Sequence, residues 1–278
     1  MESHAWAIAL VLAAASLLCA GCTAPAESGA SDDAARLEML SLLGGMQGAV
    51  TGNLTAIDRA AAETAAGLGS TGLSGPQAEA LLDGALAADP SVSTAIVVAR
   101  NGTVTAARPA GTGLVGSNLG EQAVVREVFD RKAPVMSDLF PLAEGGYAAT
   151  IEYPVFSPDE TVIGMVSVAF LPDRLVGGHA EAAVKGTPYA VMVAQSDGRV
   201  LYDADPEEIG KETLNESLCA DFPEVLETAR SFSGNWSGHA AYSFYDTGFG
   251  GVVRKEAYWT SVGLHGTEWR LVVIRPLS

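Results

Sequence analysis

The sequence contains little of the chemistry on which metal centres and disulfide-stabilised folds depend. It has 3 cysteines and 4 histidines among 278 residues. Cys19 and Cys22 lie in the first 22 residues, which leaves Cys219 as the single thiol of the remaining chain. One thiol cannot form an intrachain disulfide, and a zinc site built from several cysteines is excluded.

Catalytic motifs are scarce as well. The chain has no H-E-x-x-H or H-x-x-H pair, no G-x-S-x-G turn and no Walker motif. The acidic residues of the stretch 203–208 lie close together on a predicted turn. Solvent-exposed charge and helix capping explain them more simply than paired-carboxylate catalysis or a Ca²⁺ site does. We therefore expect no enzymatic activity, no cofactor and no bound metal ion.

Basic residues are few. The chain has 16 Lys and Arg against 33 Asp and Glu, a formal net charge of −17. Such a surface repels nucleic acids, so we expect no nucleic-acid partner. Apolar residues make up 48% and charged residues 18%, which excludes a disordered chain. The length suits two domains of ordinary size.

The N-terminus predicts export from the cytoplasm. A nearly continuous apolar run, Ala5 to Ala20, ends in Cys19-Ala20-Gly21-Cys22 and is followed by a polar stretch, 23–33, that we expect to be a linker. This segment resembles the lipobox of prokaryotic lipoproteins, which implies that Cys22 is lipidated. Alternatively, residues 1–22 stay as a signal anchor, because about 18 apolar residues can span a bilayer. Both readings place the chain on the extracytoplasmic face of a cell membrane.

Residues 34–90 are expected to be helical. Apolar residues recur there at three- and four-residue spacing, the period of one helical face. They are Leu37, Leu40, Leu43, Met46, Val50, Leu54, Ile57 and Ala61. The spacing predicts a helix over 32–67, in which Gly44-Gly45 could introduce a break, and Pro76 opens a second helix. The apolar stripe either packs on its own domain or forms the seam of a homodimer.

The rest of the chain contains a repeat. Residues 95–119 and 189–211 each show an apolar run, a tight turn and a bend. The turns end at Gly102 and Gly198, and the bends end at Gly116 and Gly210. Two copies of one hairpin predict two copies of one small α+β module, module one over 91–178 and module two over 179–278.

Each module is predicted to follow a ββαβββ plan, with antiparallel strands because the turns are short. In module one we expect strands at 92–100, 103–108, 135–140, 147–156 and 162–171 and a helix at 119–131. After a helical link, 172–185, module two has expected strands at 189–195, 199–203, 238–245, 252–262 and 267–275 and helices at 214–220 and 223–230.

Several short segments in this order carry a resemblance to a known family. They are Leu114–Leu119, Pro134–Asp138, Ile151–Val155, Ile163–Val166 and Tyr202–Lys211. Together with the long leading helix, they make residues 35–278 similar to a double Cache domain, the PAS-like sensory module of chemoreceptors and sensor kinases. The resemblance implies an α+β fold with two antiparallel sheets and covering helices, and a small-molecule pocket in the membrane-distal module, here module one.

Candidate ligand-binding residues in module one are its charged, hydroxyl and phenolic side chains. They are Arg108, Arg126, Ser137, Asp138, Tyr147, Glu152 and Tyr153. An Arg that clamps a carboxylate, with Asp138 on an ammonium, would suit an amino acid. Amino-acid-binding family members carry Arg-Trp-Tyr in the covering helix, whereas residues 122–129 read QAVVREVF. A small carboxylate or an apolar compound therefore remains an alternative ligand.

Module two is richer in aromatic residues, most of which alternate as sheet core would. Trp236, His239 and Lys255 form a candidate second binding site. We interpret the chain as an extracytoplasmic, small-molecule-binding sensory lipoprotein. Because no output domain follows, it is expected to signal through a membrane receptor or sensor kinase, or through a homodimer along the leading helix. The alternative is a cell-envelope interaction or scaffold protein without a soluble ligand.

Overall fold

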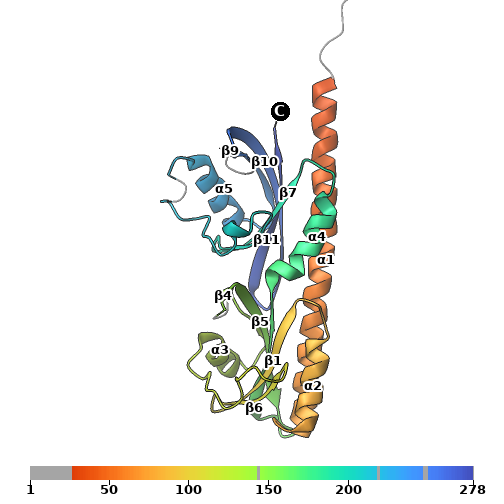
Figure 1. Ribbon diagram of the computed structural model, residues 1–278, viewed down its shortest axis with the longest axis vertical. Helices are drawn as coiled ribbons and strands as arrows, with labels where there is room; N and C mark the ends of the chain where they lie inside the picture. Colours follow the sequence, from red (N-terminus) through yellow and green to blue (C-terminus); the bar gives the residue numbers. More distant parts are fainter. Residues whose placement is uncertain (1–26, 143–144, 218–219, 247–249, 278) are drawn as a thin grey trace, which may run out of the picture. The chain divides into compact units, whose positions relative to one another are not determined.

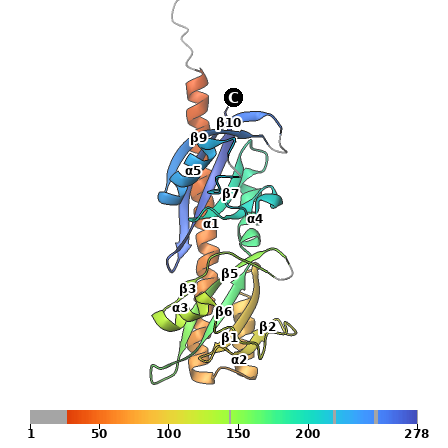
Figure 2. The same cartoon turned by 90° about the vertical axis from the view of Figure 1, so that its left-hand side faces the viewer.

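The computed structural model describes residues 27–142, 145–217, 220–246 and 250–277. The predicted signal segment with Cys22, and also Cys219, lie outside these residues. The chain divides into two compact units, Met1–Glu38 and Met39–Ser278. The sheets, their covering helices and every site discussed below belong to the second unit (Figures 1 and 2).

Helix α1 is a single helix, Glu27–Thr71, and it continues through Gly44-Gly45 without a break. It begins within the stretch that we expected to be a linker. The predicted apolar stripe is buried from Leu43 to Ala61, because residues at this spacing face the two sheets of their own chain, and Met39 and Leu68 extend the buried face at its two ends. The prediction is wrong for its first two members, because Leu37 and Leu40 are 68% and 47% exposed. Helix α2, Pro76–Leu86, follows.

Module one contains an antiparallel sheet in the order β2-β1-β6-β5-β3, with β4 also paired to β5. Its long strands are β1 (Val92–Ala99), β2 (Val104–Arg108), β5 (Tyr147–Phe156) and β6 (Val162–Phe170). The strand expected at 135–140 is instead two short strands, β3 (Val135–Met136) and β4 (Phe140–Pro141). Helix α3 (Ala123–Arg131) covers this sheet.

Module two repeats this arrangement. Helix α4 (Pro172–Val184) leads into a sheet in the order β8-β7-β11-β10-β9. Its strands are β7 (Ala190–Gln195), β8 (Val200–Asp203), β9 (Gly238–Tyr245), β10 (Val252–Leu264) and β11 (Thr267–Pro276). A 3-10 turn, η1 (Pro206–Glu208), follows β8, and α5 (Pro223–Gly234) covers the sheet. The helix predicted at 214–220 is wrong, since residues 214–217 and 220 are turns and coil.

The repeated hairpins have the same hydrogen bonds. In module one the amide of Gly116 donates to the carbonyl of Val104, and in module two the amide of Gly210 donates to that of Val200. Gly116 and Gly210 have φ angles of 89° and 86°, a left-handed conformation that favours glycine. The repeat seen in the sequence is therefore one backbone unit made twice.

Each sheet has a helical layer on both faces (Figure 1). Helices α1 and α2 cover one face of module one and α3 the other, while α1 and α4 cover one face of module two and α5 the other. One hydrophobic core runs along the α1 side through both modules, and a separate core lies under each of α3 and α5. The predicted α+β fold class is confirmed.

Candidate functional site

The face of the module-one sheet beneath α3 contains a buried carboxylate. Glu152, in the middle of β5, is 2% exposed. Its Oε1 atom accepts hydrogen bonds from the hydroxyl groups of Thr150 at 3.1 Å and Ser167 at 3.0 Å. Its Oε2 atom is buried and has no hydrogen-bond partner in the described part of the chain. An unpaired buried carboxylate oxygen is costly, and such groups are concentrated at functional sites.

Burial changes the ionisation of this group. The loss of solvation raises the pKa of Glu152 to about 7, although the two hydroxyl groups oppose the shift and the negative charge of Glu127 on α3 adds to it. Near neutral pH the carboxyl is therefore shared between its protonated and ionised forms. A ligand that brings a positive charge or an N–H donor to Oε2 would stabilise the ionised form.

Glu152 and its polar neighbours Ser137, Thr150 and Ser167 form a polar row that lies between apolar walls. The Ser137 hydroxyl accepts from the amide of Thr150 at 2.9 Å and donates to the carbonyl of Asp138 at 2.8 Å. The apolar side chains of this face form one cluster, Ile96, Val98, Val104, Ala107, Val125, Val128, Phe129, Val135 and Met165. Small-molecule sites commonly pair apolar walls with a few aimed polar groups. Ser167 belongs to this set and was missed, although a polar residue within an apolar strand is a usable signal.

The two candidate arginines bind carboxylates of their own chain. Arg108 at the end of β2 forms ion pairs with Glu79 at 2.6 Å and Asp83 at 2.9 Å, both on α2. Arg126 on α3 is exposed and pairs with Glu121 at 3.0 Å. It lines an open hollow of about 360 Å³ between α3 and the β1–β2 hairpin. Neither guanidinium is bonded to the polar row around Glu152.

The other candidates of module one point toward module two or toward α1. Asp138 is exposed, and its pKa is raised by partial burial and by the charge of Asp197 in module two. Tyr147 packs against the backbone of Gly210. The Tyr153 hydroxyl donates to Asp58 on α1 at 2.8 Å. Of the seven predicted residues, Ser137 and Glu152 share the hydroxyl-lined face.

The three candidates of module two do not converge. Trp236 is 64% exposed, and its indole N–H donates to Glu268 at 2.9 Å. His239 Nε2 lies 2.9 Å from the buried carboxylate of Glu256. Lys255 lies on the opposite face of the sheet from Glu256, with its Nζ atom 5.7 Å from the Phe244 ring centroid.

The strand registers identify what occupies the Glu152 position in module two. In module one Glu152 pairs with Ser167, which pairs with Ile96 on β1. In module two Trp259 pairs with Val272, which pairs with Met192 on β7. Ile96 and Met192 each lie six residues before the hairpin glycine.

Trp259 therefore occupies the place of Glu152. It is 2% exposed, and its ring packs against Gly238, where no side chain would fit. This bulky ring fills the sheet face under α5.

No described helix is long and apolar enough to cross a membrane. Within the described ranges, no group of three or more His, Cys, Asp or Glu side chains could hold a metal ion.

Comparison with known proteins agrees with the fold. Residues 52–172 match the family model "HK/GC/Chemotaxis protein-like, sensor domain". An extracellular ligand binding receptor from Desulfohalobium retbaense is 27% identical, with a TM-score of 0.71 over 85% of this chain and 40% of the receptor. This chain thus spans about two fifths of that relative. No curated protein sequence matches.

Chemoreceptor and kinase domains show the same architecture at lower identity. The ligand-binding domain of the Pseudomonas aeruginosa chemoreceptor PctB, in complex with L-Gln, is 15% identical with a TM-score of 0.63, covering 85% of this chain and 89% of its own. The extracellular domain of a putative histidine kinase is 13% identical with a TM-score of 0.68, covering 89% and 97%. The chain therefore has the Cache-like fold of chemoreceptor and sensor-kinase ligand-binding domains, and its residues 52–172 carry the sensor-domain sequence pattern.

Proposed function

We propose that the chain is an extracytoplasmic sensor that binds a small solute on the α3-facing surface of module one. The observation that carries this proposal is the buried Oε2 atom of Glu152, which has no hydrogen-bond partner among the residues that the structure describes. It lies under α3, between apolar walls, in the segment that matches the sensor-domain family. A solute that supplies the missing partner would be bound and oriented there.

The chemistry of this surface favours a ligand with an ammonium or amide N–H group. The polar row contains a carboxylate and hydroxyls, while Arg108 and Arg126 are paired elsewhere. Chemoreceptor domains with the same fold have been solved in complex with L-Gln, GABA and L-serine, each of which carries an amino group. An ammonium-bearing solute is thus preferred here over a simple carboxylate.

Module one is the preferred site because the corresponding surface of module two is filled. Trp259 stands at the position of Glu152 and bonds through its indole N–H to the carbonyl of Asn235 at 3.2 Å. We further propose that the chain is tethered at the membrane surface, through lipidated Cys22 or a retained anchor, and signals through a receptor or sensor-kinase partner.

Calorimetric titration with amino acids, alkyl amines and matched carboxylates tests this function. We expect an ammonium-bearing solute to bind the wild type, and Glu152→Gln to weaken that binding at least tenfold. The exposed Glu160, at the β5–β6 turn, gives a matched control, and Glu160→Gln should bind as the wild type does. If no solute binds, or both variants bind equally, the sensor proposal fails and a scaffold role is favoured.

A further inference from the structure

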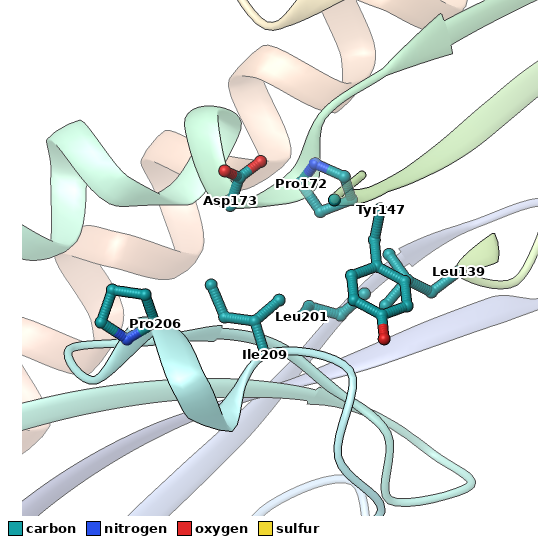
Figure 3. Close-up of a pocket in the computed structure, with 8 residues that line it drawn as sticks. Leu139, Tyr147, Pro172, Asp173, Leu201, Pro206 and Ile209 are labelled. Atoms are coloured by element: carbon teal, nitrogen blue, oxygen red, sulfur yellow. The ribbon is translucent and has the colours of Figure 1, made fainter. Parts of the chain in front are cut away.

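A second candidate site lies where the two modules meet (Figure 3). A cavity of about 270 Å³ opens there, half enclosed by protein. Module one, the first turn of α4, and strand β8 with the η1 bend of module two contribute its lining residues. They are Leu139, Gly146, Tyr147, Pro172, Asp173, Leu201, Pro206 and Ile209. Neither module forms this junction cavity alone, so a molecule inside it would contact both.

The walls of the junction cavity are mainly apolar. Leu201 and Ile209 lie on one side and Pro172 on the other, with the Tyr147 ring closing one end (Figure 3). Leu201 is 1% exposed, which makes this wall part of the core. The volume is slightly below the usual range for ligand sites, about 300–1,000 Å³. The cavity therefore suits a short hydrocarbon chain or a single ring.

Contacts that need no ligand hold these walls in place. The amide of Leu139 donates to the side-chain carbonyl of Gln195, which ties module one to module two. Gly210 lies against the Tyr147 ring so closely that a Cβ atom would overlap it. Asp205 caps η1 by accepting from the amide of Glu207 at 3.0 Å. A preformed site loses less conformational entropy when it binds.

Two polar groups of the lining lack a partner. The carboxylate of Asp173 and the hydroxyl of Tyr147 make no hydrogen bond or ion pair with the described part of the chain. The adjoining η1 turn adds the acids Glu207 and Glu208, and the cation Lys211 is paired with Glu208 at 2.7 Å. This charge pattern attracts a cation and repels a carboxylate.

We propose that the junction cavity binds a small organic ammonium ion with a hydrocarbon body. The ammonium group pairs with Asp173 at the rim, and the hydrocarbon packs between Pro172, Leu201 and Ile209. Because the ligand contacts both modules, binding stabilises their junction. This site is separate from the Glu152 surface, and neither proposal depends on the other.

Titration of the ¹⁵N-labelled chain with hexylammonium, hexanol and hexanoate, followed by amide NMR, tests the location. Hexylammonium should shift the signals of Gly146, Tyr147 and Ile209 and saturate at one equivalent, whereas hexanoate should not. Shifts confined to Thr150 and Ser167, or equal binding of hexanoate, would overturn the proposal.

Variants separate the two sites. Asp173→Asn should weaken hexylammonium binding at least tenfold, while Asp130→Asn, which changes an exposed carboxylate of α3, should leave it unchanged. Ile209→Trp, at a partly exposed wall position, should abolish binding, and Glu152→Gln should have no effect. Equal hexylammonium affinity of the two Asp variants, or loss of hexylammonium binding in Glu152→Gln, would contradict a site at the junction. These two outcomes can be judged even if Ile209→Trp does not fold.

Discussion

The sheet faces under α3 and α5 differ at one structurally equivalent position. Glu152 of module one, paired with Ser167, corresponds by register to Trp259 of module two, paired with Val272. The carboxylate lacks a partner for one oxygen, whereas the indole packs on Gly238 and donates to a backbone carbonyl. The same backbone therefore supports a buried polar centre in one copy and an apolar core in the other.

The two modules also differ in where their remaining charges lie. In module two, Asp203 at the end of β8 is largely buried, which raises its pKa to about 6, with neighbouring Glu208 and Asp205 contributing. Burial lowers the pKa of Lys255 on β10. Asp203 lies on the edge strand β8, and Lys255 lies four residues before Trp259 on β10. The centre of the sheet face under α5 is apolar, as an interior that binds no solute would be.

The largest predicted effect removes the side chain that closes module two. Trp259→Ala should lower the free energy of unfolding by about 3–5 kcal/mol, because it deletes a buried ring and leaves a cavity. Chemical denaturation monitored by circular dichroism measures this. Trp236→Ala is the matched control, and its 64% exposed ring should cost less than about 1 kcal/mol. Equal losses would contradict the assignment of Trp259 to the core.

The second prediction concerns pH and the polar centre of module one. The pKa of Glu152 in the folded chain, about 7, exceeds its ordinary value of 4.5. A carboxyl with a raised folded-state pKa stabilises the fold most below pH 4.5, and this contribution disappears as pH rises to about 7. The difference corresponds to about 3 kcal/mol.

Unfolding measured from pH 4 to 8 in wild type and Glu152→Gln tests this dependence. The stability of the wild type relative to the variant should fall over the interval from 4.5 to 7. A constant difference between the two proteins would show that the buried carboxyl does not titrate there.

The third prediction compares the two repeated bends. Gly116 and Gly210 share a left-handed conformation, so alanine strains both by about 1 kcal/mol. A Cβ at Gly116 meets open space, but at Gly210 it meets the Tyr147 ring. Gly210→Ala should therefore cost about 1–3 kcal/mol more than Gly116→Ala. Thermal unfolding of the two variants measures the difference, and equal costs would argue against close packing at the junction.

The smallest effect is expected where both modules meet α1. Asp58 of α1 accepts from the Tyr153 hydroxyl of module one at 2.8 Å and lies 2.6 Å from His265 Nε2 of module two. Tyr153→Phe should cost about 1 kcal/mol by removing one hydrogen bond. Tyr202→Phe should cost almost nothing, because no described residue bonds that hydroxyl. Urea denaturation of both variants would test this. Equal stabilities would show that the Tyr153–Asp58 hydrogen bond does not stabilise the fold.

Much of the backbone could be predicted from local sequence. The hairpin glycines, the alternation of apolar residues and the helical periodicity specify turns, strands and the stripe of α1 through local conformational energy and burial. The predictions at 135–140 and 214–220 were wrong. Ser137 leaves regular strand pairing, where its side chain bonds the backbone of Thr150. In both stretches, tertiary contacts and turn geometry outweigh local propensity.

The surroundings of the candidate side chains could not be predicted from local sequence. Neighbouring strand residues face opposite sides, so Glu152 and Tyr153 could not both line one pocket. Arg108 is the clearest case of a role decided by distant residues, because its partners on α2 are about 25 to 29 positions away in sequence. A charge seen in the sequence does not reveal whether a partner neutralises it.

The sequence by itself determined a repeated α+β module, its turns and the long apolar face of α1, because these depend on neighbouring residues and on the periodicity of burial. Only the tertiary structure decided that Glu152 stands buried with one oxygen unpaired while Trp259 fills the same place in module two. Strand pairing brings together side chains that are more than ten positions apart in the sequence, and no local pattern shows which of them will be in contact.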